Sequence, residues 1–270
     1  MKNIVIAAGY ATRLYPLTEN YPKPLLKIGE STILDRLLDD VDTIDDVDEH
    51  IIVTNHKFAS FFEEWAQKRL SQSSQQVKPI RIIDDGTTTN NTRLGAVRDL
   101  LLAITGSPDG VVPQAALDRG HTSHLSSLIS RSNDIMVLAA DNILDFSLQG
   151  FVDFFKQKGT SVIMCHYEPE LKKLQRTGVV AVDENMKVLE MQEKPECPVS
   201  HWAVPPFYIY NKVDLPLICD CLNHDCGFDA PGNLAHYLVG VTTLHAWQMP
   251  GQRFDIGSLD SYEEALRLFS

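Results

Sequence analysis

The chain has 270 residues, 44% of them hydrophobic, and 36 acidic against 24 basic side chains give it a formal net charge of −12. This length allows one large α/β domain or two small ones, and the acidic excess argues against a general nucleic-acid binder, whose surface must attract the phosphate backbone. No apolar run approaches the roughly 18 residues that span a bilayer, and five irregularly spaced cysteines do not make a disulfide framework. We therefore expect a globular protein of the cytoplasm, with no membrane or nucleic-acid partner.

Segments with strand and helix patterns alternate along the first half of the chain. Apolar runs predict strands over 3–8, 50–54, 80–83 and 135–140, and amphipathic spacing predicts helices over 33–41, 58–70 and 94–104. This β-α-β-α order favours an α/β fold with a doubly wound, mostly parallel sheet. In such sheets ligands bind outside the carboxyl ends of the strands. We expect Gly9, Gly86 and Asp141, which follow three of these runs, to meet at one edge.

The second half of the chain carries shorter strands joined by turns. They are predicted over 161–167, 179–182, 188–191 and 207–210, and an amphipathic helix over 259–269 closes the chain. This pattern indicates a β-rich lobe that extends the same sheet, so we expect one domain over 1–270. The polar segment 106–132, rich in Gly, Ser, His and Asp, is interpreted as an inserted loop.

A loop of small residues that ends in a cation follows the first predicted strand. It runs from Gly9 to Arg13, and a second cation, Lys23, follows in the segment Tyr-Pro-Lys-Pro-Leu-Leu. Backbone N–H groups in such a turn can approach an anion closely, and the two cations add charge where phosphates would lie. These residues suit a nucleoside triphosphate, with an ordinary turn as the alternative. Neither G-x-G-x-x-G nor G-x-x-x-x-G-K-[ST] occurs, which excludes a Rossmann dinucleotide loop and a P-loop.

The same segment resembles the N-terminal signature of the sugar-phosphate nucleotidyltransferases, also called nucleotide-sugar pyrophosphorylases. The matching residues are Ala-Gly-Tyr-Ala-Thr-Arg-Leu over 8–14, Pro-Leu-Thr over 16–18 and Pro-Lys-Pro-Leu-Leu over 22–26. The family usually has Gly where this chain has Ala11, and often Gly at Ala8; a Cβ at Ala11 narrows the approach of a phosphate to the backbone. The resemblance implies a Rossmann-like nucleotide-diphospho-sugar transferase fold, with a nucleotide-binding half over 1–142 and a sugar-phosphate-binding half over 143–270.

The activity that this resemblance implies is transfer of a nucleotidyl group from a nucleoside triphosphate to a sugar 1-phosphate, with release of pyrophosphate. Such chemistry needs positioning and charge neutralisation more than a covalent nucleophile. Arg13 would bind the β- and γ-phosphates, and Lys23 would assist the leaving pyrophosphate. Nucleotide contacts are implied for the small-residue loop and two later glycines: Ala7, Ala8, Gly9, Ala11, Thr12, Arg13, Gly86 and Gly95.

Two aspartates after apolar segments are candidate ligands of Mg²⁺. Ile-Met-Val-Leu-Ala-Ala-Asp-Asn over 135–142 resembles the family's apolar strand followed by G-D-N, which implies that Asp141 binds the metal. Gly-Gln-Arg-Phe-Asp-Ile-Gly-Ser over 251–258 resembles the family's W-x-D-x-G-T, whose Asp, here Asp255, completes the site. A magnesium ion held by few carboxylates and by phosphates suits this chemistry. The alternative for each residue is an aspartate that caps a turn.

The resemblance also implies three residues that bind the sugar phosphate. Glu193-Lys194-Pro195 resembles the family's E-K-P, in which Glu193 would contact sugar hydroxyls and Lys194 the phosphate. Gly178 would approach the sugar closely. Glu-Lys-Pro alone also occurs in solvated turns. The catalytic residues implied by the whole resemblance are Arg13, Lys23, Asp141 and Lys194.

Two other functions stay open at this point. A cytidylyltransferase acting on phosphocholine or a similar phosphate shares the N-terminal signature, and its quaternary amine would favour an aromatic cage. Residues for such a cage, unless they lie in the core, are Trp202, Phe207, Tyr208 and Tyr210. A non-catalytic nucleotide-sugar sensor is supported by Ala11 and by the insert 106–132. The sequence does not decide the base, the sugar or whether the chain forms a homo-oligomer.

Overall fold

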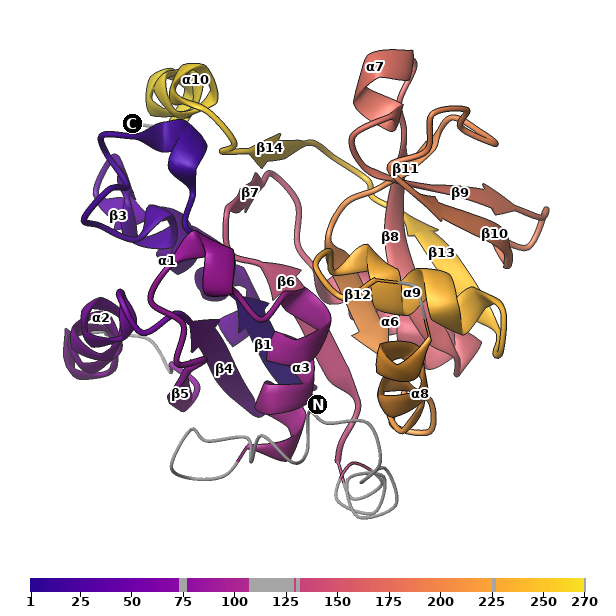
Figure 1. The fold of residues 1–270 in the computed structure, drawn as a ribbon, viewed down its shortest axis with the longest axis horizontal. Coiled ribbons are helices and arrows are strands. Elements are labelled where there is room, and N and C mark those ends of the chain that lie inside the picture. The colour runs from indigo at the N-terminus through magenta and orange to yellow at the C-terminus, as the bar shows by residue number, and fades with distance from the viewer. Residues whose placement is uncertain (73–76, 107–128, 130–131, 225–226, 270) are drawn as a thin grey trace. The chain divides into compact units, whose positions relative to one another are not determined.

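The computed structural model describes residues 1–72, 77–106, 129, 132–224 and 227–269, so most of the segment 106–132 lies outside the described residues. The described chain forms two compact units of mixed α/β structure (Figure 1). The first unit comprises Met1–Leu94, Ala139–Gln149 and Pro250–Ser270, and the second comprises Gly95–Leu138 and Gly150–Met249. In the part of the chain that is described, no helix is both long and apolar enough to cross a membrane.

A parallel sheet forms the centre of the first unit. Its strands β1 (Lys2–Ile6), β4 (Glu49–Thr54) and β5 (Ile80–Asp84) lie in the order β1-β4-β5. Ile51 of β4 lies opposite Ile4 on one side and Arg81 on the other. All of β4 from His50 to Thr54 is buried, as expected for a parallel strand with protein on both faces. The parallel pairing expected from the β-α-β order is therefore present.

The α-helices among the described residues of the first unit are α1 (Ile33–Asp42), α2 (Ala59–Gln72) and α10 (Leu259–Phe269). The first helix begins after Thr32, whose side chain accepts a hydrogen bond from the Asp35 backbone while the Asp35 carboxylate accepts one from Thr32 N. This capping box satisfies two N–H groups that a helix start leaves free. The buried face of α1 follows helical spacing through Ile33, Leu34, Leu37, Leu38 and Val41.

Short elements complete the first unit. Strands β2 (Lys27–Ile28) and β3 (Ser31–Thr32) form one antiparallel pair, and β7 (Asn142–Leu144) and β14 (Arg253–Asp255) form another. Three short 3₁₀ helices are η1 (Thr12–Leu14), η2 (Lys23–Leu25) and η3 (Asn90–Thr92). The first two carry the cations Arg13 and Lys23 of the N-terminal motif.

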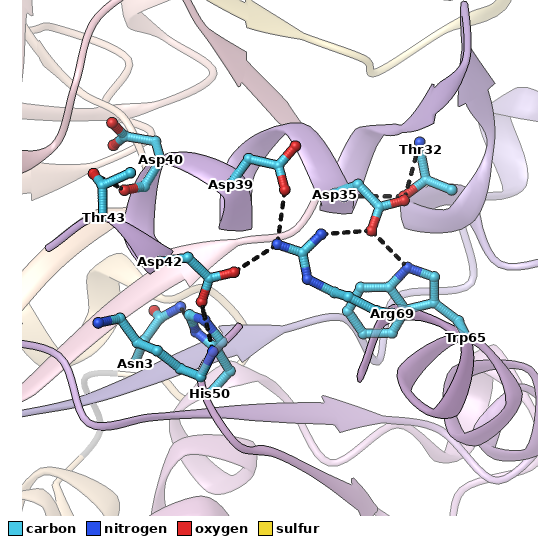
Figure 2. A network of polar contacts seen from close by, with 11 residues as sticks. Asn3, Thr32, Asp35, Asp39, Asp40, Asp42, Thr43, His50, Trp65 and Arg69 are labelled. Carbon is cyan, nitrogen blue, oxygen red and sulfur yellow. Dashed lines mark hydrogen bonds and ion pairs between the residues drawn. The ribbon is translucent and has the colours of Figure 1, made fainter. Parts of the chain in front are cut away.

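A buried arginine ties α1 to α2 (Figure 2). The Arg69 guanidinium of α2 forms ion pairs with three carboxylates of α1, at 2.9 Å to Asp35, 2.8 Å to Asp39 and 2.7 Å to Asp42. Asp35 also accepts a hydrogen bond from the Trp65 indole at 3.0 Å. The Arg69 and Asp42 side chains are only 8% and 7% exposed. Removing either one would therefore leave the other as a buried charge without its counter-charge.

The same network continues from α1 into the sheet (Figure 2). His50 Nε2 lies 2.9 Å from Asp42 Oδ1, and His50 Nδ1 lies 2.9 Å from Asn3 Nδ2. Burial raises the pKa of Asp42, but the hydrogen bonds from His50, the Lys78 backbone and Arg69 outweigh burial and lower it. The carboxylate of Asp42 therefore joins α1 and α2 to β4 and β1 in its charged form.

We expect Arg69→Met to lower the free energy of unfolding by about 3 kcal/mol, because it leaves Asp42 buried without its cation. The neighbouring Lys68 provides a matched control, since its 2.7 Å pair with Glu64 is exposed. Lys68→Met should leave the free energy of unfolding nearly unchanged, because solvent screens an exposed ion pair. Urea denaturation of both variants measures the difference, and equal losses would contradict the importance of the buried network.

The second unit is built on a mixed, mostly antiparallel sheet. Its strand order is β10 (Val188–Glu193), β9 (Gly178–Val182), β11 (Trp202–Val204), β8 (Ser161–Tyr167), β12 (Phe207–Tyr210) and β6 (Ile135–Ala139), and β13 (Leu244–Gln248) pairs with β8 in parallel. The helices in its described part are α3 (Ala96–Thr105), α6 (Gln149–Lys158), α7 (Leu171–Leu174), α8 (Leu217–Asn223) and α9 (Gly232–Val239). The α/β fold class and the β-rich second part are confirmed.

Candidate active site

The loop after β1 is built from small residues in a constrained conformation. Ala7 and Ala8 are buried, whereas Gly9, Thr12 and Arg13 are exposed. A Cβ added at Gly9 would meet no atom within 4 Å, so the space next to Gly9 is open. Within the described part of the chain no carboxylate forms an ion pair with Arg13, which leaves this cation available to an anion.

Ala11 holds the left-handed conformation that glycine favours. Its φ is 45° and its ψ 42°, directly before η1, and a Cβ in this region costs roughly 1 kcal/mol. Two hydrogen bonds to the Ala11 carbonyl fix the turn, from Thr18 Oγ1 at 2.8 Å and from Leu14 N at 3.0 Å. The chain therefore keeps at Ala11 the backbone turn that a glycine would form most easily.

Asn55, which the sequence analysis did not select, fixes the position of this loop by a hydrogen bond to its backbone. Its buried side chain donates from Nδ2 to the Ala8 carbonyl at 3.0 Å and accepts at Oδ1 from Phe58 N at 3.1 Å. Asn55 directly follows β4, and a polar residue at the carboxyl end of a buried strand was its one sequence signal. The end of β4 thereby positions the loop that follows β1.

The segment after β5 lies beside the same loop. Tyr10 Oη is 3.4 Å from Thr87 Oγ1, and Gly86 between β5 and Thr87 has a φ of 75°. The Asp85 carboxylate accepts hydrogen bonds from Thr87 N and Oγ1, both at 2.7 Å. Burial nevertheless raises the pKa of Asp85 to about 6. Beside it, the hydrogen bond and charge of the Asp84 carboxylate, 2.5 Å from His56 Nδ1, raise the pKa of His56.

We expect Asp85 to make the protein less stable as the pH rises from about 4 to about 6. Its pKa is about 6 in the folded chain and about 3.9 when unfolded, so the folded state holds the extra proton in this window and loses that advantage as the pH rises. Asp85→Asn should flatten this limb of the curve of unfolding free energy against pH. Asp45→Asn, which changes an exposed carboxylate, should leave the curve unchanged. Urea denaturation between pH 4 and 8 measures both, and parallel curves for Asp85→Asn and the unaltered protein would contradict the assignment.

Lys23 and Asp141 form a partly buried ion pair in the first unit. Lys23 Nζ lies 2.7 Å from Asp141 Oδ2, and the lysine side chain is only 10% exposed. The other carboxylate oxygen, Asp141 Oδ1, accepts a hydrogen bond from Asn142 Nδ2 at 2.7 Å. The backbone directly before Asp141 is fixed to β1, because Ala140 N donates a hydrogen bond to the Ile6 carbonyl. The structure thus brings together a cation and a carboxylate that the sequence analysis assigned to separate roles.

Asp255 is placed next to Asp141 by the pairing of β14 with β7. Asp255 lies opposite Asn142 in that pair, and Ile256 N donates to the Asp141 carbonyl at 3.0 Å. The Asp255 side chain is 54% exposed, and Arg253 Nη1 lies 3.6 Å from its Oδ2. The surrounding protein partly desolvates Asp255 and raises its pKa, and the negative charge of Asp141 adds to that rise. This mutual repulsion of two carboxylates is what a bound cation relieves.

These two carboxylates suit a magnesium ion that arrives with phosphates. Among the described residues, no group of three or more His, Cys, Asp and Glu side chains could hold a metal by itself. Mg²⁺ is typically held by one or two carboxylates, with the remaining positions taken by phosphate oxygens and water. Asp141 and Asp255 provide that number of hard oxygen ligands.

The second unit holds the residues expected to bind the sugar phosphate. Gly178 begins β9, and Glu193, at the end of β10, lies directly opposite it. Burial raises the pKa of Glu193, against the lowering effect of Lys194, whose Nζ lies 3.8 Å from Glu193 Oε1. Lys194 is exposed and has a φ of 49°, which is uncommon for a residue with a side chain. Its backbone is held there by a 3.1 Å hydrogen bond from Lys194 N to the Thr177 carbonyl.

Gly232, in the segment Asp-Ala-Pro-Gly-Asn over 229–233, is a further residue beside Glu193. It begins α9, which packs on β10. A Cβ added at Gly232 would lie 2.2 Å from Glu193 Oε2, and one added at Gly178 would lie 3.4 Å from the same oxygen. The carboxylate of Glu193 therefore occupies space that two glycines leave open, and no sequence pattern could have shown that contact.

Gly95 belongs to the second unit and precedes α3. Its φ is 91°, and an added Cβ would lie 2.7 Å from the Phe228 carbonyl, so a larger residue does not fit. The first N–H groups of α3 donate within the chain, Ala96 N to Asp229 O at 3.2 Å and Val97 N to Phe228 O at 3.0 Å. These two N–H groups are therefore already used within the chain.

The aromatic residues considered for a quaternary amine are mostly core residues. Phe207, Tyr208 and Tyr210 of β12 are at most 3% exposed, and the two tyrosine rings stack with centroids 5.7 Å apart. Trp202 of β11 is partly buried and meets the edge of Tyr167 at 6.1 Å. They do not form an open cage in this structure.

A cleft of about 600 Å³ lies elsewhere in the first unit, over α1 and α2. Its lining includes Tyr21, Phe61, Trp65 and Arg69 and none of the predicted site residues. Arg69, in this lining, is already paired with the carboxylates of α1.

The family model described as nucleotidyl transferase matches residues 2–269. Glucose-1-phosphate adenylyltransferase of Fervidobacterium nodosum is 22% identical over 278 residues, which cover 98% of this chain and 60% of the relative. Glucose-1-phosphate thymidylyltransferase of Neisseria gonorrhoeae is 28% identical over 215 residues, which cover 78% of this chain and 62% of the relative.

Solved structures show the same fold. A crystal structure of UDP-glucose pyrophosphorylase complexed with UDP-glucose superimposes with a TM-score of 0.73 at 19% identity, covering 98% of this chain and 97% of that one. The chain spans about three fifths of the length of the curated relatives that it matches.

Proposed function

This chain belongs to the nucleotidyl transferase family, and we propose that it transfers a nucleotidyl group from a nucleoside triphosphate to a sugar 1-phosphate. An oxygen of the sugar phosphate would attack the α-phosphorus in line with the bond to the β-phosphate, and pyrophosphate would leave. The observation that carries the proposal is the cluster of Lys23, Asp141 and Asp255. Lys23 begins η2, Asp141 directly precedes β7, and Asp255 ends β14.

The nucleotide would be held by the small-residue loop. Its residues Ala7, Ala8, Gly9, Ala11 and Thr12 would offer backbone N–H groups to the phosphates, with Gly86 alongside. Arg13, exposed and without a carboxylate partner among the described residues, would bind the β- and γ-phosphates and stabilise the charge that develops on pyrophosphate. Gly95 would contact the nucleotide through its backbone.

Asp141 and Asp255 would hold Mg²⁺. Such an ion, when bound, neutralises phosphate charge and stabilises the leaving pyrophosphate. Lys23, now 2.7 Å from Asp141 Oδ2, would add a positive charge for the phosphates beside these carboxylates. The chain's own contribution is to hold a cation and two carboxylates at fixed positions before the substrates bind.

The sugar phosphate would be bound by the second unit. Glu193, whose carboxylate lies in space that Gly178 and Gly232 leave open, would accept hydrogen bonds from sugar hydroxyls. Lys194, whose ammonium is exposed, would bind and orient the attacking phosphate. The names of the adenylyltransferase and the thymidylyltransferase share glucose 1-phosphate and differ in the nucleotide, so glucose 1-phosphate is the first acceptor to test.

Pyrophosphate release tests the proposal. The common nucleoside triphosphates are each combined, with Mg²⁺, with glucose 1-phosphate, other sugar 1-phosphates and phosphocholine. Release that requires one triphosphate and one sugar 1-phosphate supports the proposal and identifies both substrates. Release with phosphocholine alone replaces the sugar acceptor by a choline-type acceptor. Thermal stabilisation by a nucleotide sugar without release from any pair refutes the transferase and favours a sensor.

A further inference from the structure

The Arg253 guanidinium contacts side chains of both β7 and β14, beside Asp141 and Asp255. Arg253 and Asp255 are two residues apart in β14, so strand alternation places them on the same face, and Asp255 lies opposite Asn142 of β7. Arg253 Nη1 lies 3.6 Å from Asp255 Oδ2 and also donates a hydrogen bond to Asn142 Oδ1. The Arg253 side chain is 16% exposed, so its position is set by these contacts and by the surrounding protein.

Asn142 passes this constraint to Asp141. Its amide oxygen accepts from Arg253, so its amide nitrogen is the end that faces Asp141 Oδ1, at 2.7 Å. A reversed amide would place an oxygen against a carboxylate oxygen and would lose the Arg253 hydrogen bond as well. Asn142 is fully buried. The guanidinium, together with the Ala139 carbonyl that accepts from the same amide nitrogen at 3.4 Å, therefore fixes which end of the amide meets Asp141.

We propose that Arg253 is a positioning residue, which orients Asp255 directly and Asp141 through Asn142 toward the metal ion of the nucleotidyl transfer. The inference rests on the proposed function and goes beyond it, because it assigns no substrate contact to Arg253. Arg253 instead contacts groups that hold or orient the proposed metal ligands. Loss of such contacts typically weakens metal affinity 10- to 100-fold.

Charge repulsion alone predicts the opposite sign. An arginine near a bound divalent cation repels it, by about 2 kcal/mol at roughly 4 Å in a water-like dielectric, so removing the charge would by itself tighten metal binding about 30-fold. Loss of the orientation of the two carboxylates weakens metal binding instead, so the sign of one measured change in metal affinity separates the two explanations.

Binding of Mn²⁺, followed by the loss of the electron paramagnetic resonance signal of the free ion, tests the proposal. The titration is made with and without the triphosphate that supports pyrophosphate release. Arg253→Met should weaken Mn²⁺ binding about tenfold and lower kcat more than it raises KM for the triphosphate. Arg253→Lys, which keeps a charged donor, should recover part of both. Arg267→Met, an exposed position of α10, is the control and should change neither.

Each result decides a different point. Equal or tighter Mn²⁺ binding by Arg253→Met overturns the proposal, because that is the result expected from charge alone. An unaltered protein that binds Mn²⁺ and releases pyrophosphate, with an Arg253→Met variant indistinguishable from it, removes this inference and leaves the proposed function standing. An unaltered protein that neither binds Mn²⁺ nor releases pyrophosphate removes the proposed function, and the positioning role with it.

Discussion

Asp141→Asn is expected to lower kcat for pyrophosphate release by about 1,000-fold, which corresponds to roughly 4 kcal/mol of transition-state stabilisation. The substitution keeps the shape of the side chain and an acceptor oxygen but removes the charge proposed to hold Mg²⁺. It also leaves Lys23, whose side chain is 10% exposed, without its counter-charge. Turnover is measured at saturating substrates over a range of Mg²⁺ concentrations, and added Mg²⁺ should restore little of it.

A loss of folding must be separated from a loss of catalysis in this variant. Asp145→Asn is the matched control, because Asp145 is an exposed carboxylate four residues further on whose oxygen accepts from Gln252 N at 2.6 Å, a bond that asparagine preserves. It removes the same charge from the same unit and should retain near-normal turnover. Thermal unfolding of both variants shows how much protein is folded at the assay temperature. Near-normal turnover of folded Asp141→Asn would refute the role of Asp141 as a metal ligand.

The longer elements follow the sequence pattern closely because their burial is periodic. The helix predicted over 33–41 is observed as Ile33–Asp42, with its apolar face buried and its start fixed by the capping box of Thr32 and Asp35. Strands 161–167 and 207–210 match β8 and β12 residue for residue. In all three elements local spacing and tertiary burial favour the same structure.

Short elements escape such reasoning because their stability comes from a distant partner. The strands β7 and β14 are three residues each, too short for a periodic signal, and they exist as a pair. That pair is what brings Asp255 beside Asp141, so the composition of the site depends on an element that periodicity does not show. The sequence could suggest both aspartates through a resemblance, but their contact with Lys23, Asn142 and Arg253 follows only from the fold.

Gly232→Ala is expected to raise KM for the sugar 1-phosphate 10- to 100-fold while leaving KM for the nucleoside triphosphate nearly unchanged. The new Cβ would lie 2.2 Å from Glu193 Oε2, so the carboxylate must rotate away from the position proposed to bind sugar hydroxyls. Losing a hydrogen bond to a charged group costs about 1.5–3 kcal/mol, which matches that range of affinity. Initial rates against each substrate in turn measure the two constants.

Stability and affinity should respond differently to this substitution. The atom that gives way is the end of a flexible side chain, and alanine favours a helix over glycine by about 1 kcal/mol, so the free energy of unfolding should change little. Gly240→Ala, after the other end of α9, is the control, since its Cβ would meet only Tyr237 O at 3.5 Å. It should leave both Michaelis constants unchanged. Glu193→Gln should raise the same KM as Gly232→Ala, and an unchanged KM in both would exclude Glu193 from the sugar site even if the transferase activity is established.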